Sequence, residues 1–339
     1  AARPGAAPPT GLNGLGPTRP DPTVTRIAAS SHRRTLTHIR RVIGHSDQPM
    51  HSYFARLAPS AVLDLVHQAQ LHWLAQAVAG TEAAGLPLIS AASPCKVGGR
   101  GGPDYFTDIP AGPIALRHVS DLYMFPNMIR ALVLPGHLLR DWLEWSAAQF
   151  CQLTPGTANQ PLLNAHTPAY NFDTFSGLTY QIDLRSPART VPADKSVPGR
   201  IRDLCHAGKP IEDEDRFAVV TNNFRASGGG GFDPLATVRP LDTPSQLTRD
   251  CLVDFILSRP TLQPRAGHHW QLAPLPPGTG GWFDTGPGAR AHKDEMTALG
   301  IRPLNVTADG FLRCCWLAAQ SQPHPGTTTP LQSTAQPSI

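Results

Sequence analysis

Apolar residues recur at helical spacing in three stretches of the chain. The first spans residues 60–80, with Ser60 at the N-cap position and Gly80 as a C-terminal stop. The second spans residues 136–152 and the third residues 245–258. The apolar stripes are Val62, Val66, Ala69, Trp73 and Ala77; then Leu139, Trp142, Leu143, Ala147 and Phe150; then Leu247, Cys251, Leu252 and Phe255. This spacing predicts three amphipathic helices.

Short apolar runs between and after these helices predict strands. The runs lie at residues 86–91, 129–134, 178–184, 217–221, 270–273 and 311–317. Helices and strands are interleaved without the regular spacing of a doubly wound parallel sheet, so the pattern favours an α+β fold.

The two ends of the chain lack these patterns. Residues 1–30 hold six prolines before Thr25, and residues 321–339 are rich in Pro, Ser, Thr and Gln. Both compositions predict disorder, because neither end has the large apolar residues that a core requires. The two ends together hold ten of the 36 prolines in 339 residues.

Charge is distributed unevenly along the chain, which has a formal net charge of +4. Residues 1–43 carry seven arginines and one acid, so the remainder sums to −2. A slightly acidic body argues against a groove for a nucleic-acid polymer, which needs clustered Lys and Arg. The longest apolar runs are too short for a membrane-spanning helix, and the N-terminal residues do not resemble a signal peptide.

Neither the cysteines nor the histidines form a recognisable metal motif. The six cysteines are scattered without a CxxC pair, which indicates neither a disulfide scaffold nor a zinc knuckle. The 14 histidines include GHSD, GHLL and GHHW, but no partner cluster of carboxylates accompanies them. We expect no metal site in this chain.

Two aromatic residues stand next to predicted strands in loop-like settings. Phe125 lies in YMFPN before one strand, and Phe224 lies in TNNFR before a glycine run at residues 228–231. Each ring is either a core side chain or a stacking platform for a planar ligand. The glycine run is either a flexible turn or a place where a ligand approaches the backbone.

Lys96 and Arg100 bracket two glycines in SPCKVGGRGG. Two cations around glycines form either a site for an anion such as phosphate or a solvated basic turn.

Several long motifs occur together, in the order IGHSDQPMHSYFARLAPS, LPLISAASPCKVGGRGGPDYFTDI, VSDLYMFPN, LRDWLEWSAAQF, PAYNFDTFSGLTYQIDLRSPAR, GKPIEDEDRFAVVTNNFRASGGGGF and HHWQLAP. With these motifs, residues 43–317 resemble the C-terminal domain of the 2′,3′-cyclic-nucleotide 2′-phosphodiesterase/3′-nucleotidase family, a branch of the 5′-nucleotidase superfamily. The resemblance implies a metallophosphoesterase domain, joined by a linker helix to a substrate-binding domain that has a mixed sheet with packed helices. The metal motifs DxH, GNH[DE] and GHxH of the first domain do not occur in this sequence.

The resemblance implies a division of the chain into four parts. We expect a disordered or degenerate leader at residues 1–42 and a linker segment with an interdomain helix at residues 43–80. A nucleotide-binding domain follows at residues 81–320, and a disordered tail at residues 321–339.

The resemblance also implies a binding site for a nucleoside or nucleotide. Phe125 and Phe224 match two aromatic residues that sandwich the base, and Asn127 matches a residue that hydrogen-bonds the base edge. Further expected base or ribose contacts are Arg225, Gly228, Gly229 and Asp233. Gly230 stands where 5′-nucleotidases carry an aspartate that holds the ribose, and Asp233 is a substitute candidate.

Lys96 and Arg100 lie in the segment that the resemblance assigns to the phosphate. Tyr170, Asn171 and Asp173 match a YNFD motif, which is either part of the site or a turn tied by its Asn and Asp side chains.

The expected function is therefore nucleotide binding within a phosphoric ester hydrolase, with no catalytic residue in this chain. Divalent metals are expected only in the metallophosphoesterase domain, which would be the partner of this one, in the periplasm. Two alternatives stay open: a stand-alone non-catalytic nucleotide-binding module, and a 5′-nucleotidase or nucleotide-sugar hydrolase.

Overall fold

The computed structural model describes residues 21–189, 199–259 and 261–318. The α-helices in this part are α1 (Pro22–Ile39), α2 (Ala61–Ala77), α3 (Leu116–Leu122), α4 (Gly136–Ser146), α5 (Asn223–Ala226), α6 (Thr248–Leu257) and α7 (Lys293–Ala298). The strands are β1 (Val42–Ser46), β2 (Met50–His51), β3 (Leu88–Ala92), β4 (Asp108–Ile109), β5 (Gly112–Ala115), β6 (Ile129–Pro135), β7 (Gln160–Pro161), β8 (Thr174–Ser176), β9 (Thr179–Ile182), β10 (Ile201–His206), β11 (Lys209–Pro210), β12 (Arg216–Asn222), β13 (Trp270–Leu272), β14 (Gly280–Thr285), β15 (Ile301–Val306) and β16 (Leu312–Leu317).

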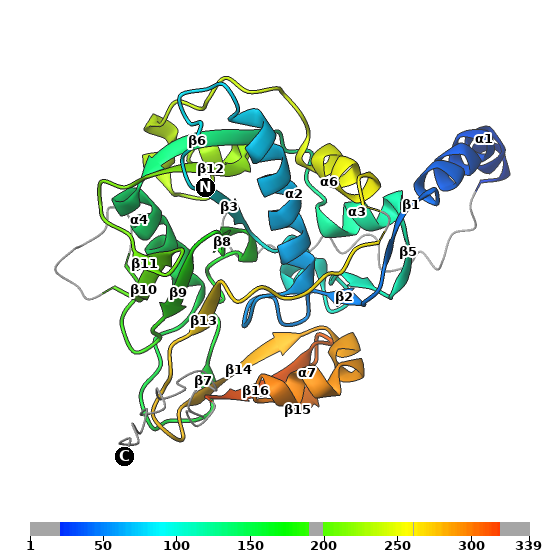
Figure 1. Ribbon diagram of the computed structural model, residues 1–339. Helices are drawn as coiled ribbons and strands as arrows, with labels where there is room; N and C mark the ends of the chain where they lie inside the picture. Colours follow the sequence, from blue (N-terminus) through cyan, green and yellow to red (C-terminus); the bar gives the residue numbers. More distant parts are fainter. Residues whose placement is uncertain (1–20, 190–198, 260, 319–339) are drawn as a thin grey trace, which may run out of the picture.

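The central sheet has the strand order β6-β12-β3-β8 and helices on both faces (Figure 1). Strand β12 is parallel to β3 and antiparallel to β6, so the sheet is mixed, as the α+β prediction requires. In β12 the side chains of Ala218 and Val220 share a cluster with α2, while Phe217 and Val219 share a cluster with α4. Burial on both faces explains why this strand reads as a continuous apolar run.

Two further four-stranded sheets complete the fold. Their orders are β11-β10-β9-β13 and β15-β16-β14-β7. The second of these carries α7 and forms the C-terminal end of the described chain, below the central sheet in Figure 1. Within the described ranges, no helix combines the length and apolar character needed to cross a bilayer.

The three predicted helices and six predicted strands are present. All five stripe residues of the second helix are buried, because α4 and the turn after it pack into the main core. The third helix begins at residue 248, three residues later than predicted. The loop before it continues the backbone pairing through Leu247, which bridges Met128.

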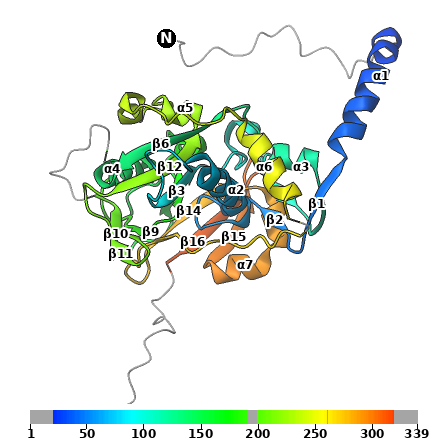
Figure 2. The ribbon, with the colours of Figure 1, turned by 45° about the horizontal axis from the view of Figure 1, so that its top comes forward.

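The leader prediction is wrong over residues 22–39, which form α1. Asp21 caps this helix by accepting from the N–H groups of Thr23 and Val24 at 2.7 and 3.2 Å, and Pro22 occupies the first turn. An N-cap followed by proline is a strong start signal. The helix buries none of its residues and stands away from the body in both views (Figures 1 and 2). Residues 1–20 and the predicted tail at residues 321–339 lie outside the described part.

The boundary expected at residue 80 does not match the packing. Strand β1 pairs with β5, and α2 lies on β3 and β12 with nine buried residues. Residues 42–80 therefore belong to the same core as residues 81–318, and the helix expected as a linker is a core helix.

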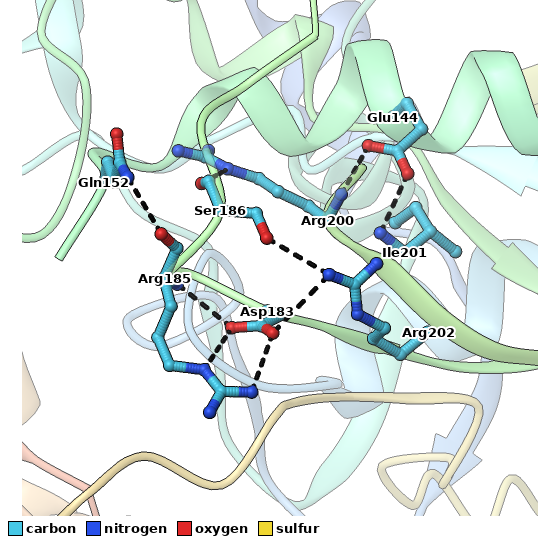
Figure 3. Close-up of polar contacts among 8 residues, drawn as sticks. All are labelled: Glu144, Gln152, Asp183, Arg185, Ser186, Arg200, Ile201 and Arg202. Atoms are coloured by element: carbon cyan, nitrogen blue, oxygen red, sulfur yellow. Dashed lines mark hydrogen bonds and ion pairs between the residues drawn. The ribbon is translucent and has the colours of Figure 1, made fainter. Parts of the chain in front are cut away.

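A buried polar network fastens α4 to β10 (Figure 3). The Glu144 carboxylate is 2% exposed and accepts from the backbone N–H groups of Arg200 and Ile201 at 2.7 and 2.9 Å. The Arg200 guanidinium donates to the carbonyls of Ser186, Ala147 and Phe150. Burial lowers the pKa of Arg200 to about 10, which still leaves it charged at neutral pH.

Candidate functional site

The paired strands β6 and β12 end at the edge of the central sheet where the two candidate aromatic residues lie. The first residue of β6 is opposite the last residue of β12. Beyond this pair, Asn223 N–H donates to the Met128 carbonyl, and Met128 N–H donates to Asn223 Oδ1, each at 2.8 Å. These bonds join the segment with Phe125 to the short helix α5 with Phe224. The structure therefore brings both predicted residues to one edge.

Both phenylalanines are exposed. Phe125 is 37% and Phe224 is 41% accessible to solvent, whereas Ile129 and Val220 in the adjoining strands are fully buried. The core alternative for the two rings is thus wrong. Tyr170 is 45% exposed and meets Phe224 edge-on, with ring centroids 6.1 Å apart. Exposed aromatic rings gathered at strand ends offer flat apolar faces to a ligand.

The glycine run packs closely against the site. A Cβ on Gly229 would lie 2.4 Å from the Phe224 carbonyl oxygen and 2.6 Å from its ring. Gly230 has φ +81°, and a Cβ there would lie 2.2 Å from Asn171 Oδ1. Asn171 Nδ2 also donates to the Gly230 carbonyl at 3.0 Å. Glycine is therefore required at positions 229 and 230, because any side chain there would collide with Phe224 or Asn171. The glycine run is thus a packed segment and not a loose turn.

Arg225 is buried behind the aromatic residues. Its side chain is 2% exposed, with Nε 2.7 Å from Asp173 Oδ2. It donates to the carbonyls of Tyr170 and Gly229, and its guanidinium lies over the Trp145 ring, 4.6 Å from the centroid. The expectation that Arg225 contacts the base or ribose is corrected by this burial. Its guanidinium positions the glycine run instead.

Asp173 is the buried counter-ion of Arg225. It is 3% exposed and also accepts from Trp142 Nε1 at 2.9 Å. Burial raises the pKa of Asp173, and the positive charge of Arg225 acts against that increase. For Asn171 and Asp173, the structural alternative is therefore the correct one, whereas Tyr170 faces solvent.

Asn127 lies between the exposed loop and the core. Its side-chain Nδ2 donates to the Tyr123 hydroxyl at 3.2 Å, and its backbone carbonyl accepts from Thr248 N–H at 2.9 Å. Burial raises the pKa of Tyr123 to about 12, so this hydroxyl stays protonated. One donor of Asn127 is thus used within the protein, and contact with a base stays a prediction.

Lys96 lies beside the loop with Phe125 but already has an acidic partner. Its Nζ is 2.6 Å from Asp121 Oδ1 and 5.3 Å from the centroid of the Tyr105 ring. The Tyr105 hydroxyl in turn contacts the sulfur of Met124, the residue before Phe125. The positive charge of Lys96 is balanced by Asp121, whose side chain is 40% exposed. A phosphate would therefore have to share Lys96 with this carboxylate.

Arg100 and Asp233 are both exposed. Arg100 lies in the 3-10 turn Gly99–Gly101, and no ion pair of its guanidinium occurs among the described residues. Asp233 begins the 3-10 helix Asp233–Thr237, and its Cα would be 3.2 Å from a Cβ on Gly228. Asp233 is therefore next to the glycine run, and the roles of both residues stay predictions.

Three residues that the sequence analysis did not select hold the site together. Asn223 ties the two strand ends, Trp145 lies under Arg225, and Tyr105 joins Lys96 to Met124. Only Asn223 had a local signal, because an Asn side chain at a strand end is suited to bond a neighbouring backbone.

One group of metal-binding side chains occurs in the described part of the chain. His51, His292 and Glu295 have donor atoms within 4.8 Å of one another, on β2 and at the start of α7. Three donor residues are too few for the two-metal centre of a metallophosphoesterase. The described residues therefore contain no such centre.

Comparison with known families identifies the family to which this chain belongs. The family model described as "5'-nucleotidase, C-terminal domain" matches residues 42–237, more than half of the chain. The chain belongs to the 5′-nucleotidase C-terminal domain family. The matched range of this 5′-nucleotidase C-terminal domain includes both strand ends, the glycine run and the buried Arg225–Asp173 pair.

Curated relatives have names that describe nucleotide phosphoesterases. The Bacillus subtilis protein named trifunctional nucleotide phosphoesterase protein YfkN is 38% identical over 260 residues, which is 75% of this chain and 18% of that protein. The Salmonella typhimurium 2′,3′-cyclic-nucleotide 2′-phosphodiesterase/3′-nucleotidase is 33% identical over 305 residues, 85% of this chain and 46% of that protein. The chain thus spans less than half the length of these relatives.

Solved structures support the same fold. A putative 5′-nucleotidase from Staphylococcus aureus has a TM-score of 0.58 at 17% identity, covering 76% of this chain and 45% of that one. A 5′-nucleotidase precursor from Thermus thermophilus has a TM-score of 0.52 at 20% identity, covering 76% and 44%. The mixed-sheet prediction is confirmed.

Proposed function

We propose that the chain is the nucleoside-binding domain of a 2′,3′-cyclic-nucleotide 2′-phosphodiesterase/3′-nucleotidase. The observation that carries this proposal is the pair of exposed rings, Phe125 and Phe224, at adjoining strand ends. Stacking of a base on an aromatic ring contributes about 1–3 kcal/mol, which repays the exposure of an apolar side chain. The names of the curated relatives support the substrate class.

The reaction itself would take place in a metallophosphoesterase domain, whose metal motifs do not occur in this sequence. Two divalent metals there would activate water and stabilise the charge on phosphorus. The domain described here would hold the nucleoside so that its 2′,3′-cyclic or 3′-phosphate reaches those metals, which converts remote binding energy into orientation. Lys96 and Arg100 would lie on the phosphate side.

Gly230 favours this function over a 5′-nucleotidase or nucleotide-sugar hydrolase. An aspartate at this position, expected for ribose binding in a 5′-nucleotidase, would place its Cβ 2.2 Å from Asn171 Oδ1. The site of this chain has no space for that carboxylate unless Asn171 moves. Asp233, exposed beside the glycine run, is the ribose candidate that remains.

Calorimetry with adenosine and 3′-AMP tests the proposal on the whole chain. Phe125→Ala and Phe224→Ala should each weaken binding by about 1–3 kcal/mol, roughly 5- to 150-fold, because a stacking face is lost. Phe224→Tyr should bind like the parent, since the ring is kept. Leu257→Ala, which removes a 54% exposed apolar side chain on α6, is the matched control. Unchanged affinity in both alanine variants would eliminate the stacking assignment.

Activity of the chain alone tests the two-domain proposal, which turnover by this chain would overturn. The chain alone should bind the nucleoside without metal-dependent hydrolysis of 2′,3′-cyclic AMP. A periplasmic location is part of the proposal and follows from the family resemblance. A stand-alone binding module would show the same binding, but its gene would lack the upstream DxH and GNH[DE] motifs.

A further inference from the structure

Two histidines and a glutamate meet where β2 approaches α7, although they are distant in sequence. His51 ends β2, while His292 and Glu295 lie at the start of α7. His51 Nε2 is 2.8 Å from Glu295 Oε2, and the rings of His51 and His292 are 3.8 Å apart between centroids. One donor atom from each of the three residues lies within 4.8 Å of the others.

The spacing on α7 suits a shared ligand. His292 is the N-cap residue and Glu295 follows three residues later, so their side chains project from the same side of the first turn. The charged groups that act on His292 are the carboxylates of Asp108 and Glu295, together with the His51 ring. A cation at this point would therefore meet one carboxylate directly, that of Glu295, while Asp108 adds negative charge nearby.

His51 is the most buried member of the cluster. The residue is 9% exposed, and its Nδ1 is buried without a hydrogen-bond partner among the described residues. A neutral imidazole always has one lone pair and one N–H, so one of its polar groups stays unsatisfied here. An ion on Nε2 would fix the tautomer with the proton on Nδ1, so it would order the ring but would leave Nδ1 without a partner.

We propose that His51, His292 and Glu295 bind one divalent transition-metal ion of the Zn²⁺ class. Two imidazoles and one carboxylate are donors that zinc accepts, and three protein ligands leave a fourth position for water. Bonds of about 2.0–2.1 Å at tetrahedral angles separate two ligand atoms by about 3.3 Å. The His51–Glu295 contact needs to open by only about half an ångström to meet that value.

The ion would tie together two parts of the fold that are 244 residues apart. Strand β2 pairs with β4 beside the α2 core, whereas α7 packs on β15 in the C-terminal sheet. Without a metal, this junction is spanned by the His51–Glu295 hydrogen bond, the contact between the His51 and His292 rings, and the bond from the Thr285 hydroxyl to the Tyr53 carbonyl. The site therefore differs from the two-metal centre of the proposed catalytic domain and departs from the expectation that this chain holds no metal.

The test is Zn²⁺ titration of the whole chain by calorimetry, with thermal unfolding as a second measurement. The parent should bind one Zn²⁺ per chain, and its unfolding temperature should rise with Zn²⁺ concentration, because the ion binds the folded state. His292→Gln and Glu295→Gln should each weaken binding about tenfold or more. His166→Gln, at an exposed histidine elsewhere, is the matched control and should bind like the parent.

Co²⁺ in place of Zn²⁺ provides a spectroscopic readout that folding alone does not supply. The parent and the His166→Gln control should show the visible absorption of four-coordinate cobalt, and the two cluster variants should lose it. Both cluster residues are partly exposed, so the metal-free variants should unfold near the parent temperature. No saturable binding by the parent, or equal affinity in all four proteins, overturns the proposal.

Discussion

Replacement of Asp173 by Asn tests whether the buried ion pair with Arg225 holds the site in place. The substitution keeps the shape of the side chain but removes its charge. Arg225, which is 2% exposed, would then be a buried cation without a counter-ion. Breaking a buried pair by removal of one partner typically destabilises a protein by about 3–5 kcal/mol. The carboxylate also accepts from Trp142, so the substitution disturbs a second buried contact as well. We therefore expect a loss of stability within that range.

Urea denaturation followed by tryptophan fluorescence measures the loss, since Trp142 and Trp145 both contact the pair. Asp242→Asn is the matched control at an exposed aspartate, where a change within about 0.5 kcal/mol is expected. Arg225→Met with Asp173→Leu should restore much of the stability, because no isolated charge remains.

The Asp173→Asn variant should also bind adenosine more weakly. Arg225 donates to the Gly229 and Tyr170 carbonyls and so orders the segment next to Phe224. A loss of stability below about 1 kcal/mol in Asp173→Asn would refute the reasoning, since a buried guanidinium cannot lose the one carboxylate paired with it among the described residues at so small a cost.

Two further predictions concern acid stability and the α4–β10 junction. Burial lowers the pKa of His269 from 6.5 to about 4, so the unfolded chain binds a proton more readily than the folded one. The contribution of neutral His269 to the free energy of unfolding is complete above pH 6.5 and falls by about 3 kcal/mol as the pH falls toward 4. Urea unfolding at several pH values should show this decrease in stability. The His269→Gln variant should show a smaller decrease. Glu144→Ala leaves the buried N–H groups of Arg200 and Ile201 without acceptors and should destabilise the fold by about 2–5 kcal/mol in the same assay. Exposed Glu82→Ala is its control, and equal midpoints for the two variants would contradict the assignment.

The sequence pattern predicted the elements that bury one continuous apolar face. Helix α4 and strand β12 were predicted because their buried residues follow one another at fixed spacing. Helix α1 was missed because the prolines before it indicated disorder and because it has no buried face, although Asp21-Pro22 is a helix start signal.

The candidate site was predictable only as far as its local parts. Each phenylalanine could be placed at a strand end, and the antiparallel register of β6 and β12 then brought the two ends together. The burial of Arg225 depends on Asp173, which is more than 50 residues earlier, and His51 meets Glu295 across 244 residues. Contacts of this separation leave no periodic signal in a single sequence.

The long separation between contacting segments also decides the order in which the chain can fold during synthesis. Strand β9 is completed on one side by β13, and β2 meets α7 only after residue 295 has been made. Strands β3, β6 and β12 can assemble with α2 before those segments leave the ribosome, since all four lie within residues 61–222. The central sheet can therefore form first, while the last quarter of the chain is added to a nucleus already in place, at the slow rate that distant contacts impose.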